Sequence, residues 1–233
     1  MPEKEPSENA FYVKLKKRGL IHLEGPDRHD FLQGLITNDI KNLTPEKPLY
    51  ACLLTPQGKF LHDFFLIEGN DFTLLDCEGG ERAQDFFRRL NMYKLRKDVQ
   101  ISIEEHNAVY AVFGAPIGIG DPRDPEMGNR TFEKPDLQEK PFEEWDINRI
   151  KLTIPDGSRD LIPEKSTMDE GRMDQLNAID YDKGCYIGQE LTARMHYRGL
   201  GKKHLQTVAL DSLPEKAELR SSCYELGLAL VKA

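Results

Sequence analysis

One thiol, set between two glycines and followed by amide, acidic and basic side chains, is the part of this sequence best suited to chemistry. Cys185 lies between Gly184 and Gly188, and glycine allows backbone conformations and close approaches that side chains forbid. From Gln189 the pattern becomes helical, so the thiol is expected in the turn that leads into a helix, beside Lys183. The amide dipoles of a helix N-terminus and a nearby ammonium both favour a thiolate. The pattern predicts a reactive thiol, and the alternative is a small buried hydrophobic side chain.

The helix that follows is rich in charged side chains. Glu190 precedes Arg194 by four residues, a spacing that supports an ion pair on one helix face. Polar groups that leave water need partners. We therefore expect a network that fixes the Cys185 loop, with Arg198 best placed to reach an anionic group; its members are Gln189, Glu190, Arg194 and Arg198.

Three segments of the chain resemble a known family. The first, KGCYIGQE at residues 183–190, is followed by Arg194 and by Tyr197-Arg198-Gly199. It resembles the signature of the YgfZ-type folate-binding proteins, which are relatives of the glycine cleavage system T-protein (aminomethyltransferase). FLQGLITNDI at 31–40 and LTPQGK at 54–59, which runs into Leu61-His62-Asp63, also match, and the resemblance covers roughly residues 10 to 205. It implies that Cys185 is the chemically active residue, supported by Lys183, Gly184, Tyr186, Gly188, Gln189, Glu190, Arg194 and Tyr197.

The resemblance also implies a fold. The family has an α+β fold, in which two interwoven antiparallel-sheet lobes with covering helices surround a folate channel and a β-barrel follows. On this basis residues 10–141 and 142–205 form the two parts of the folate-binding domain, and 206–233 form a short C-terminal β element. About 28 residues follow Leu205, too few for the strands of a barrel. We expect a reduced third domain, either a hairpin or strands that complete a sheet of the main body.

Candidate ligand-binding residues follow from the same resemblance, which implies tetrahydrofolate or a derivative as the cofactor. Trp145 would wall the pterin or aminobenzoyl ring, Arg149 would bind a folate carboxylate, and Glu164 would accept hydrogen bonds from the aminopyrimidine face. Arg198 is the further candidate for an anionic group. The alternatives are a core aromatic for Trp145 and a solvated loop acid for Glu164. Thr153 replaces the family's usual glycine near Arg149.

Three functions compete. The first is a folate-binding protein that assists assembly or repair of iron–sulfur clusters in client enzymes, including tRNA-modifying enzymes, through Cys185. The second is a tetrahydrofolate-dependent aminomethyltransferase or other one-carbon transferase, and the third is a non-catalytic folate-binding adaptor. The resemblance places His62 and Lys151 where the T-protein has acids, and proton transfer at folate nitrogens needs an acid or base. Asp63 is retained but is expected on a hairpin surface, so we do not expect glycine cleavage.

The composition argues against several classes of partner and location for this chain. A net charge of −8 argues against direct nucleic-acid binding, which needs a basic face. No apolar run reaches the roughly 20 residues that span a bilayer, and the first ten residues lack a secretion signal. Four scattered cysteines, together with His196 and His204, show no metal-ligand spacing, so no metal site is expected. We expect a cytoplasmic protein with reduced thiols and no membrane contact.

The elements that must position these residues follow from hydrophobic periodicity. Strands are expected at 20–24, 49–54, 60–67, 72–76, 99–103 and 109–113, and later at 202–210 and 226–231. Helices are expected from Gly25 to Leu35, around 83–90, at 142–150 and from Gln189. Five prolines between 114 and 141 predict a long connection without sheet strands. This order of elements favours an α+β fold with a largely antiparallel sheet.

Overall fold

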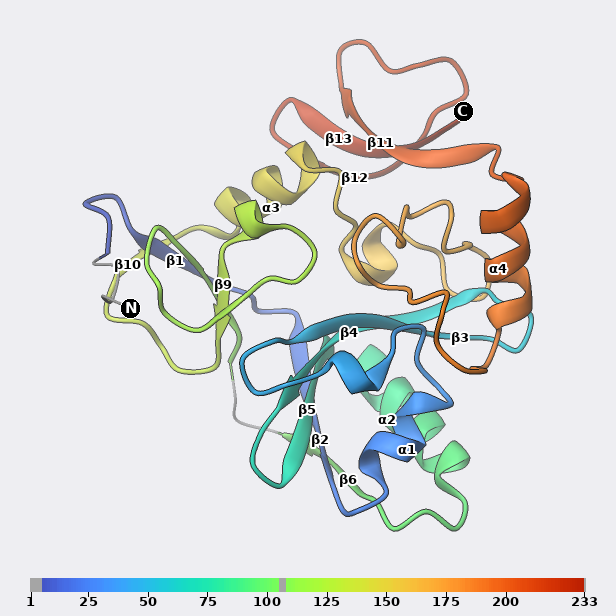
Figure 1. Ribbon diagram of the computed structural model, residues 1–233. Coiled ribbons are helices and arrows are strands. Elements are labelled where there is room, and N and C mark those ends of the chain that lie inside the picture. Colours follow the sequence, from blue (N-terminus) through green and yellow to red (C-terminus); the bar gives the residue numbers. More distant parts are fainter. Residues whose placement is uncertain (1–5, 105–107, 233) are drawn as a thin grey trace.

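A computed structural model describes residues 6–104 and 108–232, and residues 1–5, 105–107 and 233 lie outside it. The described chain folds into two five-stranded sheets and one three-stranded sheet, with helices packed around them (Figure 1). The predicted α+β fold is confirmed. No helix within the described residues has both the length and the apolar character that crossing a bilayer requires.

The first sheet carries one of the two main cores. Its strand order is β3-β4-β5-β2-β6, all antiparallel, and α1 and α2 cover one face. Apolar side chains of the sheet, such as Ile21 and Phe64, pack there against Phe86 of α2. The bounds are β2 Arg18–Glu24, α1 Arg28–Gln33, β3 Leu49–Leu54, β4 Phe60–Glu68, β5 Phe72–Glu78, α2 Glu81–Lys94 and β6 Gln100–Glu104, with the 3-10 helix η1 at Ile40–Asn42.

The second sheet interweaves with the first, because the chain starts in one, enters the other and then returns. Its order is β10-β1-β7-β9-β8, with β1 and β10 parallel. The prediction that residues 114–141 hold no sheet strand is wrong. Three short strands can form there because every proline of the segment lies outside them. The bounds are β1 Phe11–Lys14, β7 Tyr110–Phe113, β8 Ile119–Gly120, η2 Pro125–Met127, β9 Asn129–Thr131 and β10 Gln138–Lys140.

The C-terminal strands form a third sheet of their own, in the order β11-β13-β12. They neither make a simple hairpin nor extend a main sheet, because Glu218–Cys223 supplies a third strand that the sequence reading missed. Helix α3 packs against β12, β13 and β1, and so connects this sheet to the main body. The bounds are α3 Phe142–Lys151, η3 Gly157–Arg159, α4 Gln189–Arg198, β11 Lys203–Ala209, β12 Glu218–Cys223 and β13 Leu226–Lys232. The division at 141/142 and 205/206 remains a prediction.

Candidate functional site

Side chains just after α1 anchor the segment that leads to Cys185. Thr37 Oγ1 donates to the carbonyl of Ala178 at 2.6 Å. Asn38 Nδ2 donates to the carbonyls of Tyr50 and Asn177 at 2.9 and 2.8 Å. Because buried polar groups are costly to leave unpaired, these bonds fix the course of the later segment. The FLQGLITNDI match therefore has a structural explanation, since it holds the Cys185 loop in place.

Lys183 makes the strongest connection between these segments. Its Nζ donates to the carbonyls of Gln33, Ile36 and Asn38 at 2.8, 2.7 and 2.8 Å. These carbonyls lie at and beyond the C-terminal end of α1, where helix carbonyls lack intrahelical partners. Burial lowers the pKa of Lys183 to about 8, and the carboxylates of Asp39 and Asp180 oppose that shift. All three ammonium donors bond to carbonyls at and just beyond the end of α1, so Lys183 positions the loop rather than pairing with the thiol.

Two glycines bring the other two matching segments into direct contact. Gly188 has φ +83°, and a Cβ there would lie 2.4 Å from the carbonyl oxygen of Thr55. Gly58 has φ +76°, and its Cβ would lie 2.7 Å from the carbonyl oxygen of Gly188. Only glycine allows both this backbone conformation and this approach. The Thr55–Gly58 turn and the Cys185 loop therefore fit together because each has a glycine at the contact.

Cys185 itself is exposed on this anchored loop. Two backbone N–H groups hold the residues after it: Tyr186 N donates to the side-chain Oε1 of Gln189 at 3.0 Å, and Ile187 N donates to the Gly34 carbonyl at 3.2 Å. Tyr186 is half-buried, and burial raises its pKa to about 12. Gly184 is exposed, with no atom within 4 Å of a Cβ built on it. The thiol is thus presented to solvent by a loop whose neighbours are fixed.

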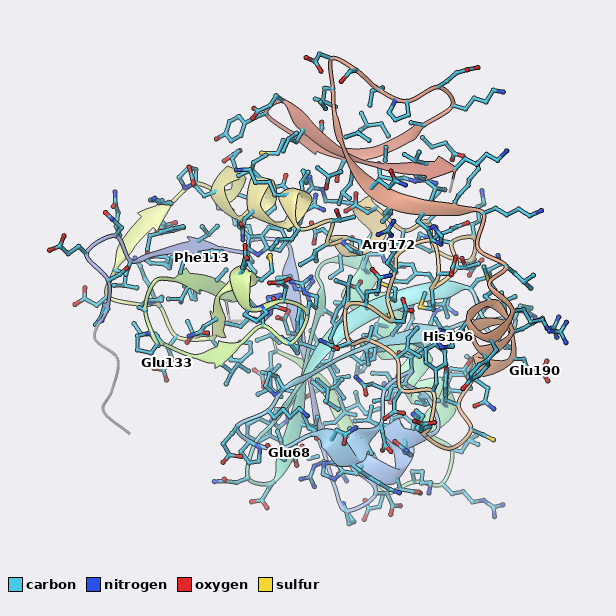
Figure 2. All side chains as sticks on the ribbon, turned by 45° about the horizontal axis from the view of Figure 1, so that its top comes forward. Glu68, Phe113, Glu133, Arg172, Glu190 and His196 are labelled. Atoms are coloured by element: carbon cyan, nitrogen blue, oxygen red, sulfur yellow. The ribbon has the colours of Figure 1, made fainter. Side chains whose placement is uncertain are left out.

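The network predicted for the charged residues of α4 does not form. Of its four members, only Gln189 bonds to the Cys185 loop. Glu190 and Arg194 make no ion pair within 4 Å in the described part of the chain, and Arg198 is exposed as well. Tyr197 is exposed and contacts His196 and Tyr181 edge-on. The reason is geometric: Glu190, Arg194 and Arg198 are exposed on α4, and Figure 2 shows Glu190 at the outer side of that helix.

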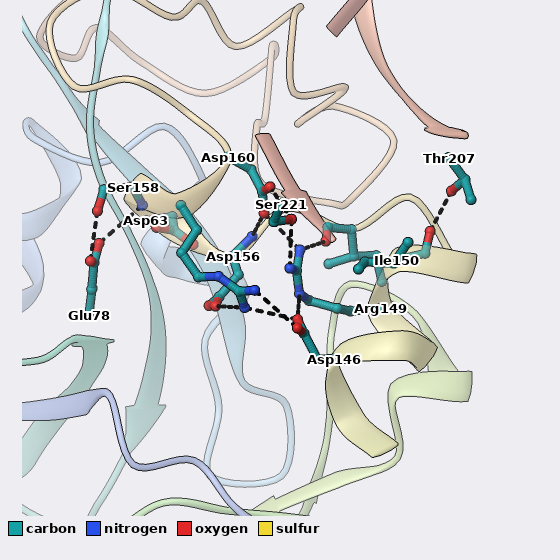
Figure 3. Close-up of polar contacts among 12 residues, drawn as sticks. Asp63, Glu78, Asp146, Arg149, Ile150, Asp156, Ser158, Asp160, Thr207 and Ser221 are labelled. Atoms are coloured by element: carbon teal, nitrogen blue, oxygen red, sulfur yellow. Dashed lines mark hydrogen bonds and ion pairs between the residues drawn. The ribbon is translucent and has the colours of Figure 1, made fainter. Parts of the chain in front are cut away.

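The structure gives Trp145 and Arg149 buried positions in the packing of α3. Trp145 packs in the main core. Arg149 is 0% exposed and donates to Asp146 at 2.6 Å, to Asp160 at 2.7 Å and to Ser221 at 2.9 Å (Figure 3). These bonds compensate the cost of burying a guanidinium. Arg149 therefore joins α3 to the C-terminal sheet, which differs from the carboxylate-binding role predicted for it.

The other predicted ligand residues lie elsewhere on the surface. Glu164 is exposed, and its carboxylate lies 3.4 Å from the guanidinium of Arg89 on α2. Arg198 lies at the end of α4. The structure does not bring Trp145, Arg149, Glu164 and Arg198 together around one cavity.

A cavity of about 790 Å³ instead opens between the two main sheets and the segment before Cys185. Its volume is in the range of small-molecule sites. Tyr50, Pro122 and Ile179 provide apolar surface, and Asp121, Asn177 and Lys47 provide polar groups. The four predicted ligand residues are not among its lining residues. Asp121 and Pro122 lie in the segment 114–141, which its prolines predicted to be a connection without strands. Neither hydrophobic periodicity nor a motif pointed to these two residues.

Asp63 lies directly behind this cavity. The prediction of a surface position is wrong, since Asp63 is buried and accepts a hydrogen bond from the hydroxyl of Tyr50 at 2.7 Å. Burial raises the pKa of Asp63, although Arg18 opposes that shift. His62 points to the opposite face of the strand, where it stacks on Phe86 of α2. Lys151 is exposed at the end of α3.

The remaining thiols are enclosed. Cys52, Cys77 and Cys223 are buried, and burial raises the pKa of each. Within residues 6–104 and 108–232, no group of three or more His, Cys, Asp or Glu side chains is arranged to hold a metal ion. Cys185 is therefore the one accessible thiol of the described chain, and it belongs to no such group.

Comparison with known proteins identifies the family. The human iron-sulfur cluster assembly factor IBA57, mitochondrial, is 30% identical, and the match covers 91% of this chain and 71% of that protein. The chain belongs to the IBA57 family. The homologue from Pyricularia oryzae is 31% identical over 91% of this chain, which spans only 61% of that relative's length. No family model matches the chain.

The fold has its own relative among solved structures. The glycine cleavage system aminomethyltransferase T from Bartonella henselae superposes with a TM-score of 0.71, covering 99% of this chain and 79% of that one, at 14% identity. This confirms the T-protein-like fold that the sequence motifs predicted.

The expected cytoplasmic location is contradicted by relatives of this family, which are named as mitochondrial proteins. The expectation rested on the lack of an apolar secretion signal, which argues only against export.

Proposed function

We propose that this chain is an iron–sulfur cluster assembly factor, of the YgfZ type, in which Cys185 binds a cluster shared with another protein. The observation that carries the proposal is an exposed thiol on an anchored loop that belongs to no group of three or more potential metal ligands among the described residues. Iron–sulfur clusters are held by several thiolates or equivalent ligands, so a single cysteine supplies one and a partner supplies the others. The thiol gives up its proton when it binds iron.

The relatives support this proposal through their names, which describe iron–sulfur cluster assembly in mitochondria. We infer the same process and location for this chain. Its partners would be cluster-carrying proteins and the client enzymes that receive clusters, with tRNA-modifying enzymes among the clients.

We further propose that tetrahydrofolate or a derivative occupies the cavity of about 790 Å³ beside Tyr50. The lining fits such a group, because Pro122 and Ile179 offer apolar walls for a flat ring and the exposed carboxylate of Glu46 offers acceptors for its amino groups. Lys47 lines the cavity and suits an anionic tail. When bound, folate would supply redox or one-carbon chemistry near the Cys185 loop. Calorimetry with tetrahydrofolate tests this directly, with Lys47→Glu expected to weaken binding and no heat of binding contradicting the assignment.

Complementation tests the assembly function. Cells that lack the protein should recover the activity of an iron–sulfur enzyme, measured against a cluster-free enzyme, when they express the wild type. Cys185→Ser should abolish that recovery, while Cys223→Ser, a change at a buried thiol, should retain it. Equal recovery by wild type and Cys185→Ser would remove Cys185 from the function.

The transferase alternative receives less support from the geometry. The resemblance places His62 and Lys151 where the T-protein has acids; His62 faces the α2 core, and Lys151 is exposed at the end of α3. Asp63 is buried, but Tyr50 lies between it and the cavity. We expect no aminomethyl turnover when the chain is combined with the other glycine cleavage components. Turnover at the rate of a true T-protein would favour the alternative.

A further inference from the structure

An apolar groove lies beside the Cys185 loop and is separate from the cavity near Tyr50. It has a volume of about 880 Å³ and runs between α1 and the end of α2. Phe31 and Leu35 of the α1 segment line it and are otherwise buried, and Tyr93 and Leu95 line the opposite side. It shares no lining residue with the other cavity.

Leu95 is held in solvent in an unusual way. Its side chain is 87% exposed, and its φ of +48° lies in a region that favours glycine. Met92, one turn earlier, is also exposed. Such strain and apolar exposure do not stabilise the free chain, and both features are typical of functional contact sites. Tyr224 shares both features, and what distinguishes Leu95 is that it lines the apolar groove.

Charges around the groove indicate the kind of partner. Asp30 pairs with Lys97, and the carboxylate of Asp27 accepts a hydrogen bond from the backbone N–H of Asp98 at 2.9 Å. Lys94 and Arg96 have no ion-pair partner in the described part of the chain. With Asp27 also lining the groove, its charged residues carry one net positive charge, whereas the protein as a whole carries −8. Complementarity favours an acidic partner surface.

Two hydrogen bonds link the groove to the Cys185 loop. Gly34 lines the groove, and its carbonyl accepts the N–H of Ile187. The carbonyl of the preceding residue, Gln33, accepts from Lys183 Nζ. Cys185 lies between these two points of attachment. Figure 1 shows α1, the end of α2 and the loop that enters α4 on one side of the molecule.

We propose that this groove docks the protein that shares a cluster with Cys185. That protein is an acidic, cluster-binding protein that places an apolar side chain against Leu95, Phe31 and Leu35, with its acidic groups facing Lys94 and Arg96. The inference rests on the proposed function, because a lone thiol needs a partner to complete the ligand set. Docking beside the thiol supplies the proximity that ligand exchange requires, and a central apolar anchor typically carries much of the affinity.

Site-specific crosslinking in cells tests the inference. The photoreactive residue p-benzoylphenylalanine is placed at position 95 and, in a matched chain, at position 224. Tyr224 is a suitable control, since it is also apolar, 62% exposed and at positive φ but lies in the β12–β13 turn. Position 95 should trap an acidic protein with cluster-ligating cysteines, and position 224 should not. No adduct at 95, or an adduct without such ligands, overturns the proposal.

The trapped protein, purified with its cluster, is then titrated against the full chain. Leu95→Gly removes the anchor and relieves the backbone strain, so the fold should be kept while affinity falls by at least ~10-fold. Tyr224→Gly should bind like the wild type. Unchanged affinity for Leu95→Gly overturns the groove assignment. If Leu95→Gly supports cluster enzymes fully while Cys185→Ser does not, the assembly function stands and only the docking site fails.

Discussion

At the scale of single residues, the accessibility of Cys185 separates it from the other three thiols. Cys52, Cys77 and Cys223 are enclosed, and burial raises the pKa of Cys77 to about 12. Alkylation requires both a thiolate and access. We expect Cys185 to be labelled first near neutral pH, as followed by timed alkylation and mass spectrometry. Earlier labelling of any buried cysteine would contradict this order.

A second residue-scale prediction concerns His62. Burial lowers its pKa from 6.5 to about 4, and it lies 2.9 Å from Asp85. The unfolded chain therefore binds a proton at a higher pH than the folded chain does. Neutral His62 contributes about 3 kcal/mol to the free energy of unfolding. This contribution is fully present above pH 6.5 and is lost as the pH falls towards 4.

Urea unfolding at several pH values measures this loss. His62→Gln keeps a hydrogen-bond donor for Asp85 but cannot take up a proton, so the free energy of unfolding should fall less steeply between pH 6.5 and 4. An identical slope for both chains would show that His62 does not contribute to acid destabilisation.

The sequence located the Cys185 signature but not the surroundings of its other candidates. A motif fixes which residues lie close in the chain, and for Cys185 this was sufficient to predict a loop before a helix. Arg149 depends on Asp160 and on Ser221, 72 positions away. Such a pairing has no local pattern, so a buried structural arginine and a ligand-binding one look alike in sequence.

At the scale of elements, two glycines that look equivalent in the sequence have different roles. Gly188 has positive φ, and a Cβ there would meet the Thr55 carbonyl oxygen at 2.4 Å, whereas a Cβ at Gly184 meets nothing within 4 Å. Gly188→Ala should destabilise the chain by about 2 kcal/mol or more, through backbone strain and overpacking. Gly184→Ala should change stability by less than about 0.5 kcal/mol. Chemical denaturation of the two variants compares them directly, and equal stabilities would refute the glycine contact.

Helices and long strands were predictable, and short strands were not. Helix α2 repeats buried side chains at helical spacing, and β3 is a continuous apolar run. Strands β8, β9 and β10 have two or three residues each, too few to show any period. Their pairing depends on neighbours elsewhere in the sheet, and this is why the residues of the Tyr50 cavity that lie between them were missed.

At the scale of the whole molecule, the interwoven chain path places the signature segments together. Residues 31–40, 54–59 and 183–190 meet because β3, the α1 end and the late loop pack around one another. The order of elements was sufficient to predict an α+β fold. Two strands of the C-terminal sheet were predicted as well, but the third was not, because Glu218–Cys223 is polar and partly exposed.

That third sheet is attached to the body by the buried Arg149 cluster (Figure 3). Arg149 and Asp160 are each essentially inaccessible to solvent, and Ser221 of β12 donates to Asp160 at 2.5 Å. Arg149→Met leaves the carboxylate of Asp160 buried without its cation, and such a loss typically costs about 3 to 5 kcal/mol. We expect the free energy of unfolding to fall by this amount and the backbone amides of β12 to exchange their hydrogens faster.

The double variant Arg149→Met with Asp160→Asn distinguishes a buried charge from lost packing. Neutralising Asp160 removes the uncompensated charge, so the double variant should recover part of the stability that the single change loses. Hydrogen exchange should then slow again in Glu218–Cys223. If Arg149→Met costs less than about 1 kcal/mol and leaves hydrogen exchange in β12 unchanged, the cluster does not hold the C-terminal sheet.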